Sequence, residues 1–211
     1  MQTMERTRAI AMCALVILLA ATTSCKNSRV KTVECDVLSA FINAKLAGPK
    51  GEQPPDSTSN GITRIAIVNL TESNEQLESW GQPIPWTQTA SSLQSQAPTL
   101  QRTTLDAFRE VNGQRTTFQH SFSLAFDYEV LDESQLEIVL KTGGWPAFYK
   151  RFSGSPGIMK LSRVGISADG NQALFSASHE CGGLCGGGEY VVMEKRDGRW
   201  LIEREIEMWM A

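Results

Sequence analysis

The last third of the chain carries four strand-like runs separated by three turn signals, and this pattern constrains the fold more than any other feature. Asp169-Gly170 and Asp197-Gly198 each join two of the runs, and an Asp-Gly pair supplies the positive φ angles that tight hairpins require. The glycine-rich stretch CGGLCGGG, residues 181–188, joins the middle two as a loop. The sequence therefore predicts a four-stranded antiparallel meander, with strands over 158–167, 172–180, 189–195 and 200–210.

Short helices are expected before the meander, because apolar residues recur there at spacings of three and four positions. The third of these helices is interrupted by Gly143-Gly144, and Pro146 can start a second helical segment because proline is tolerated at the first helical position. The predicted helices cover 35–47, 103–112, 132–141 and 146–152.

Two further strands are expected at 62–70, which is rich in β-branched residues, and at 118–130, where apolar and polar residues alternate. Residues 71–98 follow neither period and contain several prolines, so they are expected to form a long irregular loop. Together the segments predict an α+β fold, in which short helices pack on an antiparallel sheet. They also predict a single domain over 35–211.

The N-terminus has the layout of a secretory signal peptide. Arg6 and Arg8 precede an uninterrupted apolar run over 9–21, and small polar residues then lead to Cys25. The apolar run is shorter than the roughly 20 residues that a membrane-spanning helix needs. We expect residues 1–24 to be a signal peptide and residues 25–34 to be a tether.

The cysteine at the end of the apolar run resembles the lipidation site of bacterial lipoproteins. The resemblance implies that Cys25 becomes the lipid-bearing first residue of the mature chain. Thr22 and Ser24 depart from the residues that usually precede this cysteine, so ordinary secretion, with Cys25 as a free thiol, is the alternative. Lys26 stands where an Asp often retains lipoproteins at the inner membrane. The resemblance therefore favours the periplasm-facing outer membrane in bacteria that have two membranes.

Cys181 and Cys185 are expected to form a disulfide, because thiols pair in the oxidising compartments to which exported proteins go. Pairing of either one with Cys35 remains an alternative, since connectivity cannot be read from a sequence. A metal site using His179, Cys181 and Cys185 is less favoured. Its cysteine spacing departs from the usual zinc pairs, and the sequence offers no fourth ligand.

The stretch 161–209 resembles uncharacterised bacterial exported proteins that have no assigned activity. The shared features are Leu161-Ser162-Arg163-Val164-Gly165, the Cys-Gly-x-Leu-Cys-Gly string at 181–186, Asp197-Gly198-Arg199-Trp200 and Trp209. The resemblance implies export and a similar architecture. The run from Tyr190 to Ile202 also looks like the last hairpin of the NTF2-like folds, which implies a cone-shaped domain.

Four residues elsewhere in the sequence are candidates for a ligand pocket, although core packing is the favoured interpretation for His120 and for the aromatic residues. His120 lies on the apolar face of its alternating predicted strand, and Arg163 lies in a predicted strand that is otherwise apolar. Trp145 and Tyr149 belong to an aromatic cluster beside Pro146. Each residue also has a plain alternative as part of the core or, for Arg163, as an ion-pair partner. An exposed aromatic patch would indicate binding.

The sequence carries no signature of a catalytic site and implies no cofactor. Acidic residues outnumber basic ones by 23 to 20, which argues against nucleic-acid binding. The favoured hypothesis is a non-enzymatic lipoprotein of the cell envelope, tethered to the membrane, that binds a protein or small-molecule partner. The alternatives are a small hydrolase or isomerase with a cone-like pocket around His120 or Arg163, and a metal-binding protein.

Overall fold

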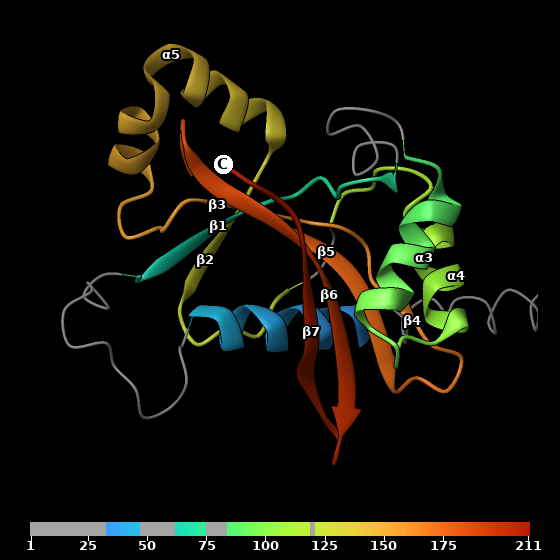
Figure 1. The fold of residues 1–211 in the computed structure, drawn as a ribbon. Helices are drawn as coiled ribbons and strands as arrows, with labels where there is room; N and C mark the ends of the chain where they lie inside the picture. Colours follow the sequence, from blue (N-terminus) through green and yellow to red (C-terminus); the bar gives the residue numbers. More distant parts are fainter. Residues whose placement is uncertain (1–32, 47–61, 75–83, 119–120) are drawn as a thin grey trace, which may run out of the picture.

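The computed structural model describes residues 33–46, 62–74, 84–118 and 121–211. They form one twisted sheet with helices on both faces (Figure 1), which confirms the α+β fold. No helix among the described residues is both long and apolar enough to cross a membrane. The strands follow the order β2-β1-β3-β5-β6-β7, with β4 beside β5. Their bounds are β1 (Arg64–Val68), β2 (Asp127–Leu131), β3 (Ile158–Leu161), β4 (Gly165–Ile166), β5 (Gln172–Gly182), β6 (Cys185–Arg196) and β7 (Arg199–Met210).

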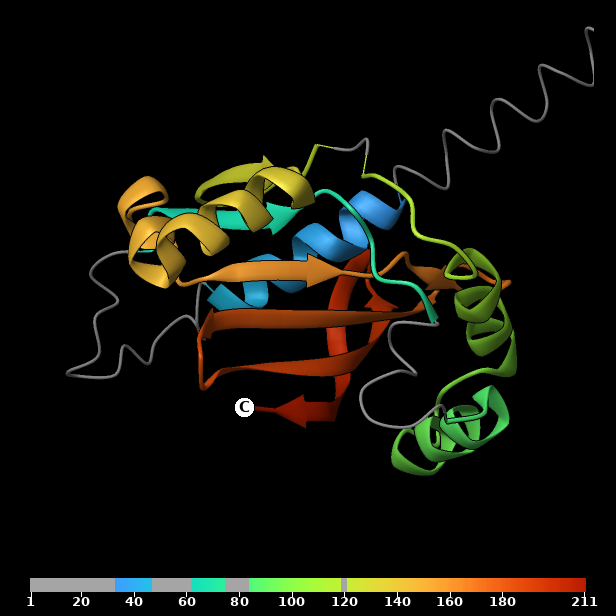
Figure 2. The same cartoon turned by 90° about the horizontal axis from the view of Figure 1, so that it is seen from above.

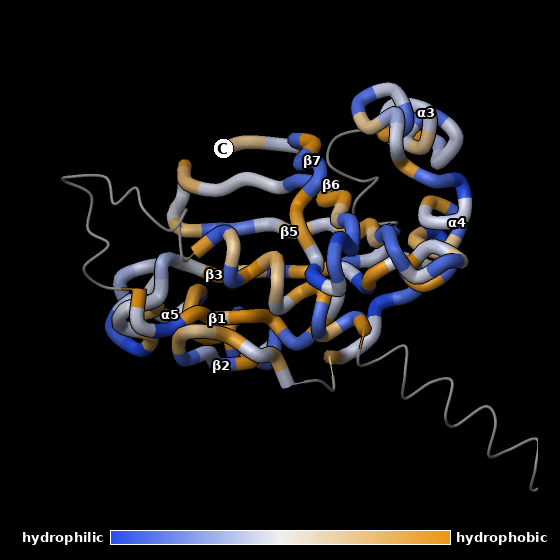
Figure 3. Tube along the Cα trace, turned by 90° about the horizontal axis from the view of Figure 1, so that it is seen from below, coloured by the Kyte–Doolittle hydropathy of each residue, from blue (hydrophilic) through white to orange (hydrophobic). Residues whose placement is uncertain are grey.

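The sheet is mixed rather than antiparallel throughout, because β1 pairs in parallel with both β2 and β3. In β1 the run from Ile65 to Val68 is fully or almost fully buried, so both faces of this strand are covered. Strands that pair in parallel are usually covered on both faces and read as continuous apolar runs. Accordingly β1 is a nearly continuous orange stretch in Figure 3.

The C-terminal meander forms as predicted, although its first strand is interrupted. Residues 158–161 and 165–166 form β3 and β4, which both pair antiparallel with β5. Asp197 and Gly198 have φ angles of 51° and 78° in the β6–β7 turn, which is the conformation expected for an Asp-Gly hairpin. The glycine-rich stretch is mostly strand, since β5 continues to Gly182 and β6 begins at Cys185.

The first described helix, residues 33–46, covers one face of the sheet. Val37, Leu38, Phe41 and Ile42 are buried in it and join a core cluster with residues of β1, β3, β5 and β6. The helix already includes Glu34, the last residue of the expected tether, and the Glu34 side chain is buried. Residues 25–32, including Cys25, lie outside the described residues.

Three helices cover the opposite face: α3 (Trp86–Gln96), α4 (Arg102–Val111) and α5 (Glu133–Arg151). Figures 1 and 2 show α3 and α4 together at one end of the sheet and α5 at the other. The prediction of an irregular loop over 71–98 is wrong where α3 forms. Leu93 is the only buried residue among the eleven of α3, and no side chain caps the helix, so this segment shows neither a helical apolar period nor a cap signal.

The break predicted near Gly143-Gly144 is confirmed. Gly144 has φ 61° and ψ −158° inside α5, a conformation that only glycine adopts readily. Pro146 follows two residues later and begins the second segment of the helix. Trp145, Phe148 and Tyr149 come after the kink and pack against one another, so the kink turns an aromatic cluster onto β1 and β3.

The strand predicted over 118–130 is mostly wrong, because only its end forms β2 (Asp127–Leu131). The aromatic residues before β2 pack locally instead. The ring of Phe122 lies 5.9 Å from that of Phe118 and 5.6 Å from that of Tyr128, with both pairs edge to face. The Phe122 N–H donates a hydrogen bond to the Tyr128 hydroxyl at 3.1 Å. Residues 121–126 form no strand, and their backbone donates hydrogen bonds to Ser39 and Asn43 of helix 33–46 instead.

Candidate functional site

A cavity of about 370 Å³ lies between the C-terminal part of helix 33–46 and one end of the sheet, and we call it the helix cavity. Its volume falls within the range of roughly 300–1,000 Å³ that is typical of small-molecule sites. Its floor is apolar and includes Phe41, Ile65, Met159 and Ala177. A second cavity of about 220 Å³, on the α3 side of β7, is smaller than that range.

The polar side of the helix cavity is held by an ion-pair cluster. Lys45 Nζ lies 3.0 Å from Glu189 Oε1 and 2.7 Å from Glu205 Oε1. Burial lowers the pKa of Lys45, but its hydrogen bonds to Glu205 and Glu189 outweigh this effect, so the pKa lies above its ordinary value. Burial raises the pKa of Glu189, while the nearby ammonium group opposes the shift. The cluster joins helix 33–46 to β6 and β7.

His179 lines the helix cavity from β5. Its Nε2 lies 3.2 Å from the carbonyl oxygen of Pro156. A carbonyl oxygen can only accept a hydrogen bond, so Nε2 carries the proton. Burial lowers the pKa of His179 below 6.5 despite this hydrogen bond, so the ring is neutral at pH 7.

Trp209 is among the lining residues, at the C-terminal end of β7. Its indole lies against the backbone of β6, where a Cβ built on Gly188 would collide with Trp209 Nε1. A Cβ on Gly186 would lie 3.3 Å from the far edge of the ring. Neighbouring residues of a strand point to opposite faces, so the indole covers the face of β6 opposite the one toward which Gly187 and Glu189 point. The glycines of the Cys-Gly string make room for the indole on that face.

The disulfide between Cys181 and Cys185 closes the β5–β6 hairpin, with 5.1 Å between the two Cα atoms, as expected. Both thiols of the alternative metal site are therefore used in this bond. Among the described residues no group of three His, Cys, Asp or Glu side chains is arranged to hold a metal ion. Cys35 is a free thiol whose pKa is raised to about 11 by burial and by its neighbours Glu34 and Asp36, so it is a poor nucleophile.

The four residues predicted to form a ligand pocket do not meet in the helix cavity. Trp145 and Tyr149 lie in α5 on the opposite face of the sheet, and the Tyr149 hydroxyl donates to the Cys181 carbonyl at 2.8 Å. Arg163 lies between β3 and β4, where it forms an ion pair. His120 lies outside the described residues.

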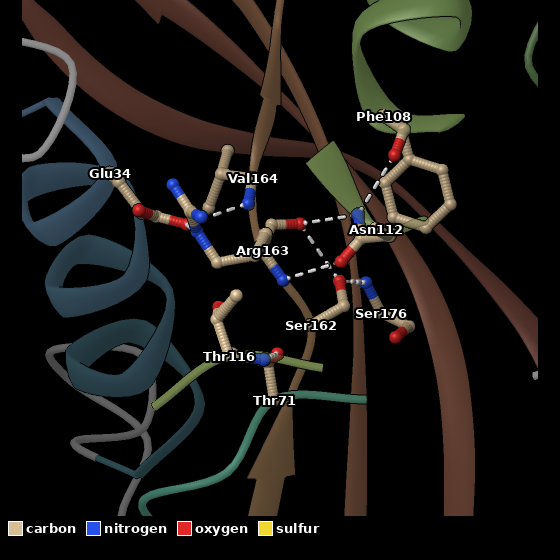
Figure 4. Close-up of polar contacts among 9 residues, drawn as sticks. All are labelled: Glu34, Thr71, Phe108, Asn112, Thr116, Ser162, Arg163, Val164 and Ser176. Atoms are coloured by element: carbon tan, nitrogen blue, oxygen red, sulfur yellow. Dashed lines mark hydrogen bonds and ion pairs between the residues drawn. The ribbon is translucent and has the colours of Figure 1, made fainter. Parts of the chain in front are cut away.

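Arg163 belongs to a buried polar cluster that fastens three elements together (Figure 4). Its Nε donates to Glu34 Oε1 at 2.7 Å, and the same oxygen accepts from the Val164 N–H at 2.9 Å. The backbone of Arg163 forms two hydrogen bonds with the side-chain amide of Asn112, which follows α4. These contacts tie helix 33–46 and α4 to the bend between β3 and β4, which is a structural use of Arg163.

Glu72 is the most enclosed carboxyl group on the α4 and α5 side of the sheet. Its two oxygens accept hydrogen bonds from Ser176 and Ser178 of β5, each at 3.2 Å. Burial raises the pKa of Glu72 above 4.5, although the two serine hydroxyls and Lys160 oppose the shift. Neither cavity reaches this group, so we assign it to the core rather than to the site.

The raised pKa of Glu72 leads to a prediction for the pH dependence of stability. The native state holds the proton of Glu72 more tightly than the unfolded state does. The stability that this proton adds is therefore complete below pH 4.5 and is lost as the pH rises through the native pKa. Glu72→Gln cannot ionise and keeps an acceptor oxygen. We expect it to gain stability relative to the wild type between pH 4.5 and pH 8 in urea unfolding curves. Glu110→Gln, on the surface of α4, controls for the loss of a charge, and an equal gain there would contradict the assignment.

Lys45, Glu189 and Trp209 were not predicted as site residues. The alternation that placed Glu205 and Glu207 on one side of the last strand was visible in the sequence, but nothing showed which helix they would face. In comparisons with family models, curated proteins and solved structures, nothing matched the chain.

Proposed function

We propose that this chain is an exported lipoprotein, anchored through Cys25, whose folded domain binds a small molecule in the helix cavity. The observation that carries the binding role is the cavity itself, which combines an apolar floor with a few convergent polar groups. The N-terminal layout supports the anchor, and the domain would face the periplasm from the outer membrane in bacteria with two membranes.

The groups that line this cavity are better suited to binding than to catalysis. His179 is the strongest candidate for an acid or base there, but its Nε2–H is engaged with a backbone carbonyl. Lys45 is held by two carboxylates, which keeps it protonated and removes it as a nucleophile. Arg163 is committed to Glu34, so it does not support the alternative of a hydrolase or isomerase built around that residue.

The binding role is tested with the neutral apolar dye N-phenyl-1-naphthylamine, whose fluorescence rises in an apolar site. We expect saturable binding to the wild type and at least a tenfold loss of affinity in Gly187→Leu. Gly187 lines the cavity, and a Cβ there would meet only the Trp209 carbonyl oxygen, at an ordinary 3.5 Å. The new side chain can therefore fill the cavity without unfolding the strand.

Gly183→Leu is the matched control, since a Cβ on this hairpin residue meets no atom within 4 Å. It adds the same side chain outside the cavity and should leave dye binding unchanged. Equal affinity in both variants, or no binding to the wild type, would refute the binding role. The anchor is tested separately by labelling cells with a fatty acid, where Cys25→Ser should abolish labelling of the protein.

A further inference from the structure

Building on the proposed binding role, we propose that the helix cavity selects an organic cation, a molecule with an ammonium group on an apolar body. Three features of the cavity favour a cation: the excess of carboxylates at its polar side, the pairing of two carboxylates across neighbouring strands, and the apolar remainder of the lining.

Negative charge exceeds positive charge at the polar side of the cavity. Lys45, Glu189 and Glu207 line it, and Glu205 lies behind Lys45, to which it is paired. His179 is neutral at pH 7 and compensates none of the carboxylates. One ammonium group therefore faces three carboxylates, and its attraction to two of them is already used in ion pairs at 3.0 and 2.7 Å.

The third carboxylate is placed where it repels one of the other two. Glu207 of β7 is the cross-strand partner of Glu189 of β6. Like charges directly opposite each other in an antiparallel pair are destabilising. Glu207 is exposed and forms no ion pair within the described part of the chain. A cation bound between these carboxylates would relieve their repulsion, whereas an anion would increase it.

The remaining lining suits the apolar part of an organic cation rather than a metal ion. Metal sites for hard cations consist of several oxygen ligands around one point. Here the floor consists of Phe41, Ile65, Met159 and Ala177, which offer no ligand atoms of that kind.

Three six-carbon compounds that differ only in the head group separate this proposal from simple apolar binding: hexyltrimethylammonium, hexanol and hexanoate. Each competes with N-phenyl-1-naphthylamine for the wild-type protein. We expect the cation to bind at least tenfold more tightly than the alcohol, and the anion to bind most weakly. The preference should shrink as salt rises, because the carboxylates are only partly buried.

Glu207→Gln should lower the ratio of cation affinity to alcohol affinity at least threefold. Glu203→Gln is the control, since this carboxylate lies on the same strand but pairs with Arg196. Equal displacement by cation and alcohol, or tighter binding of hexanoate, would overturn the choice of a cation while leaving the binding role intact. Failure of the dye itself to bind would refute the binding role.

Discussion

Asn112→Ala is expected to lower the free energy of unfolding by about 3 kcal/mol, because one amide satisfies several buried backbone groups. Asn112 is completely buried. Its Nδ2 donates to the carbonyls of Phe108 and Arg163 at 2.9 and 3.0 Å, and its Oδ1 accepts from the Arg163 N–H at 2.8 Å. Alanine would leave that N–H without its acceptor and add a small void, and each unsatisfied buried group costs about 1–3 kcal/mol.

Urea unfolding should show this loss as a lower midpoint with an unchanged slope. The melting temperature should fall by roughly 6–12 °C, given about 2–4 °C per kcal/mol for a domain of this size. Asn171→Ala removes an exposed turn amide and should stay within about 0.5 kcal/mol of the wild type. A loss below 1 kcal/mol for Asn112→Ala would contradict the role of this residue.

Glu34→Ala is expected to have the second large effect, also of about 3 kcal/mol. Removing one partner of a buried ion pair typically costs about 3–5 kcal/mol. Arg163 keeps 23% of its side chain exposed, so water compensates part of the loss. We therefore expect the lower end of this energy range. The Val164 N–H, which is buried, also loses its acceptor.

Glu34→Gln tests whether the loss comes from the missing acceptor or from the missing charge. Glutamine keeps an oxygen for both donors, so its cost should be near 1 kcal/mol in the same urea experiment. The double variant Glu34→Ala, Arg163→Met should lose less stability than the two single variants lose together, since no unpaired guanidinium remains. Strict additivity would show that the two side chains do not act together.

The C-terminal strands and the kink in α5 were predictable because short-range chemistry determines them. Asp197-Gly198 forms a tight hairpin through its own backbone angles. The backbone conformation of Gly144 likewise breaks α5 independently of what that helix contacts. The parallel pairing of β1 with β2 and β3 was not predictable in the same way. Parallel neighbours are joined by long connections, so no local turn signal specifies them.

The strand prediction over residues 118–130 was mostly wrong for a different reason. Alternation was present, but β1 offers only five residues for pairing with β2, from Arg64 to Val68. The residues before β2 therefore had no strand to extend along in that pairing, and their aromatic side chains packed together instead. A pattern of alternation shows that a segment can be a strand, whereas the length of its partner decides how much of it becomes one.

The site was the least predictable part, because its residues come from distant parts of the chain and share no motif. Lys45 lies in the first described helix, Glu189 in β6 and Trp209 in β7. In the sequence, Gly186 and Gly188 stand out only as part of a glycine-rich stretch. Their close approach to Trp209 depends on the β6–β7 register, which a single sequence does not reveal.

The position of helix 33–46 also determines when the cavity can form during folding. Strands β5, β6 and β7 are joined by hairpins, so their contacts are local and can form early. Helix 33–46 instead contacts residues far along the chain, and the Glu34–Arg163 pair spans 129 positions. We expect the meander to assemble first and this helix to dock late, so the chain gains its cavity only in the closing step of folding.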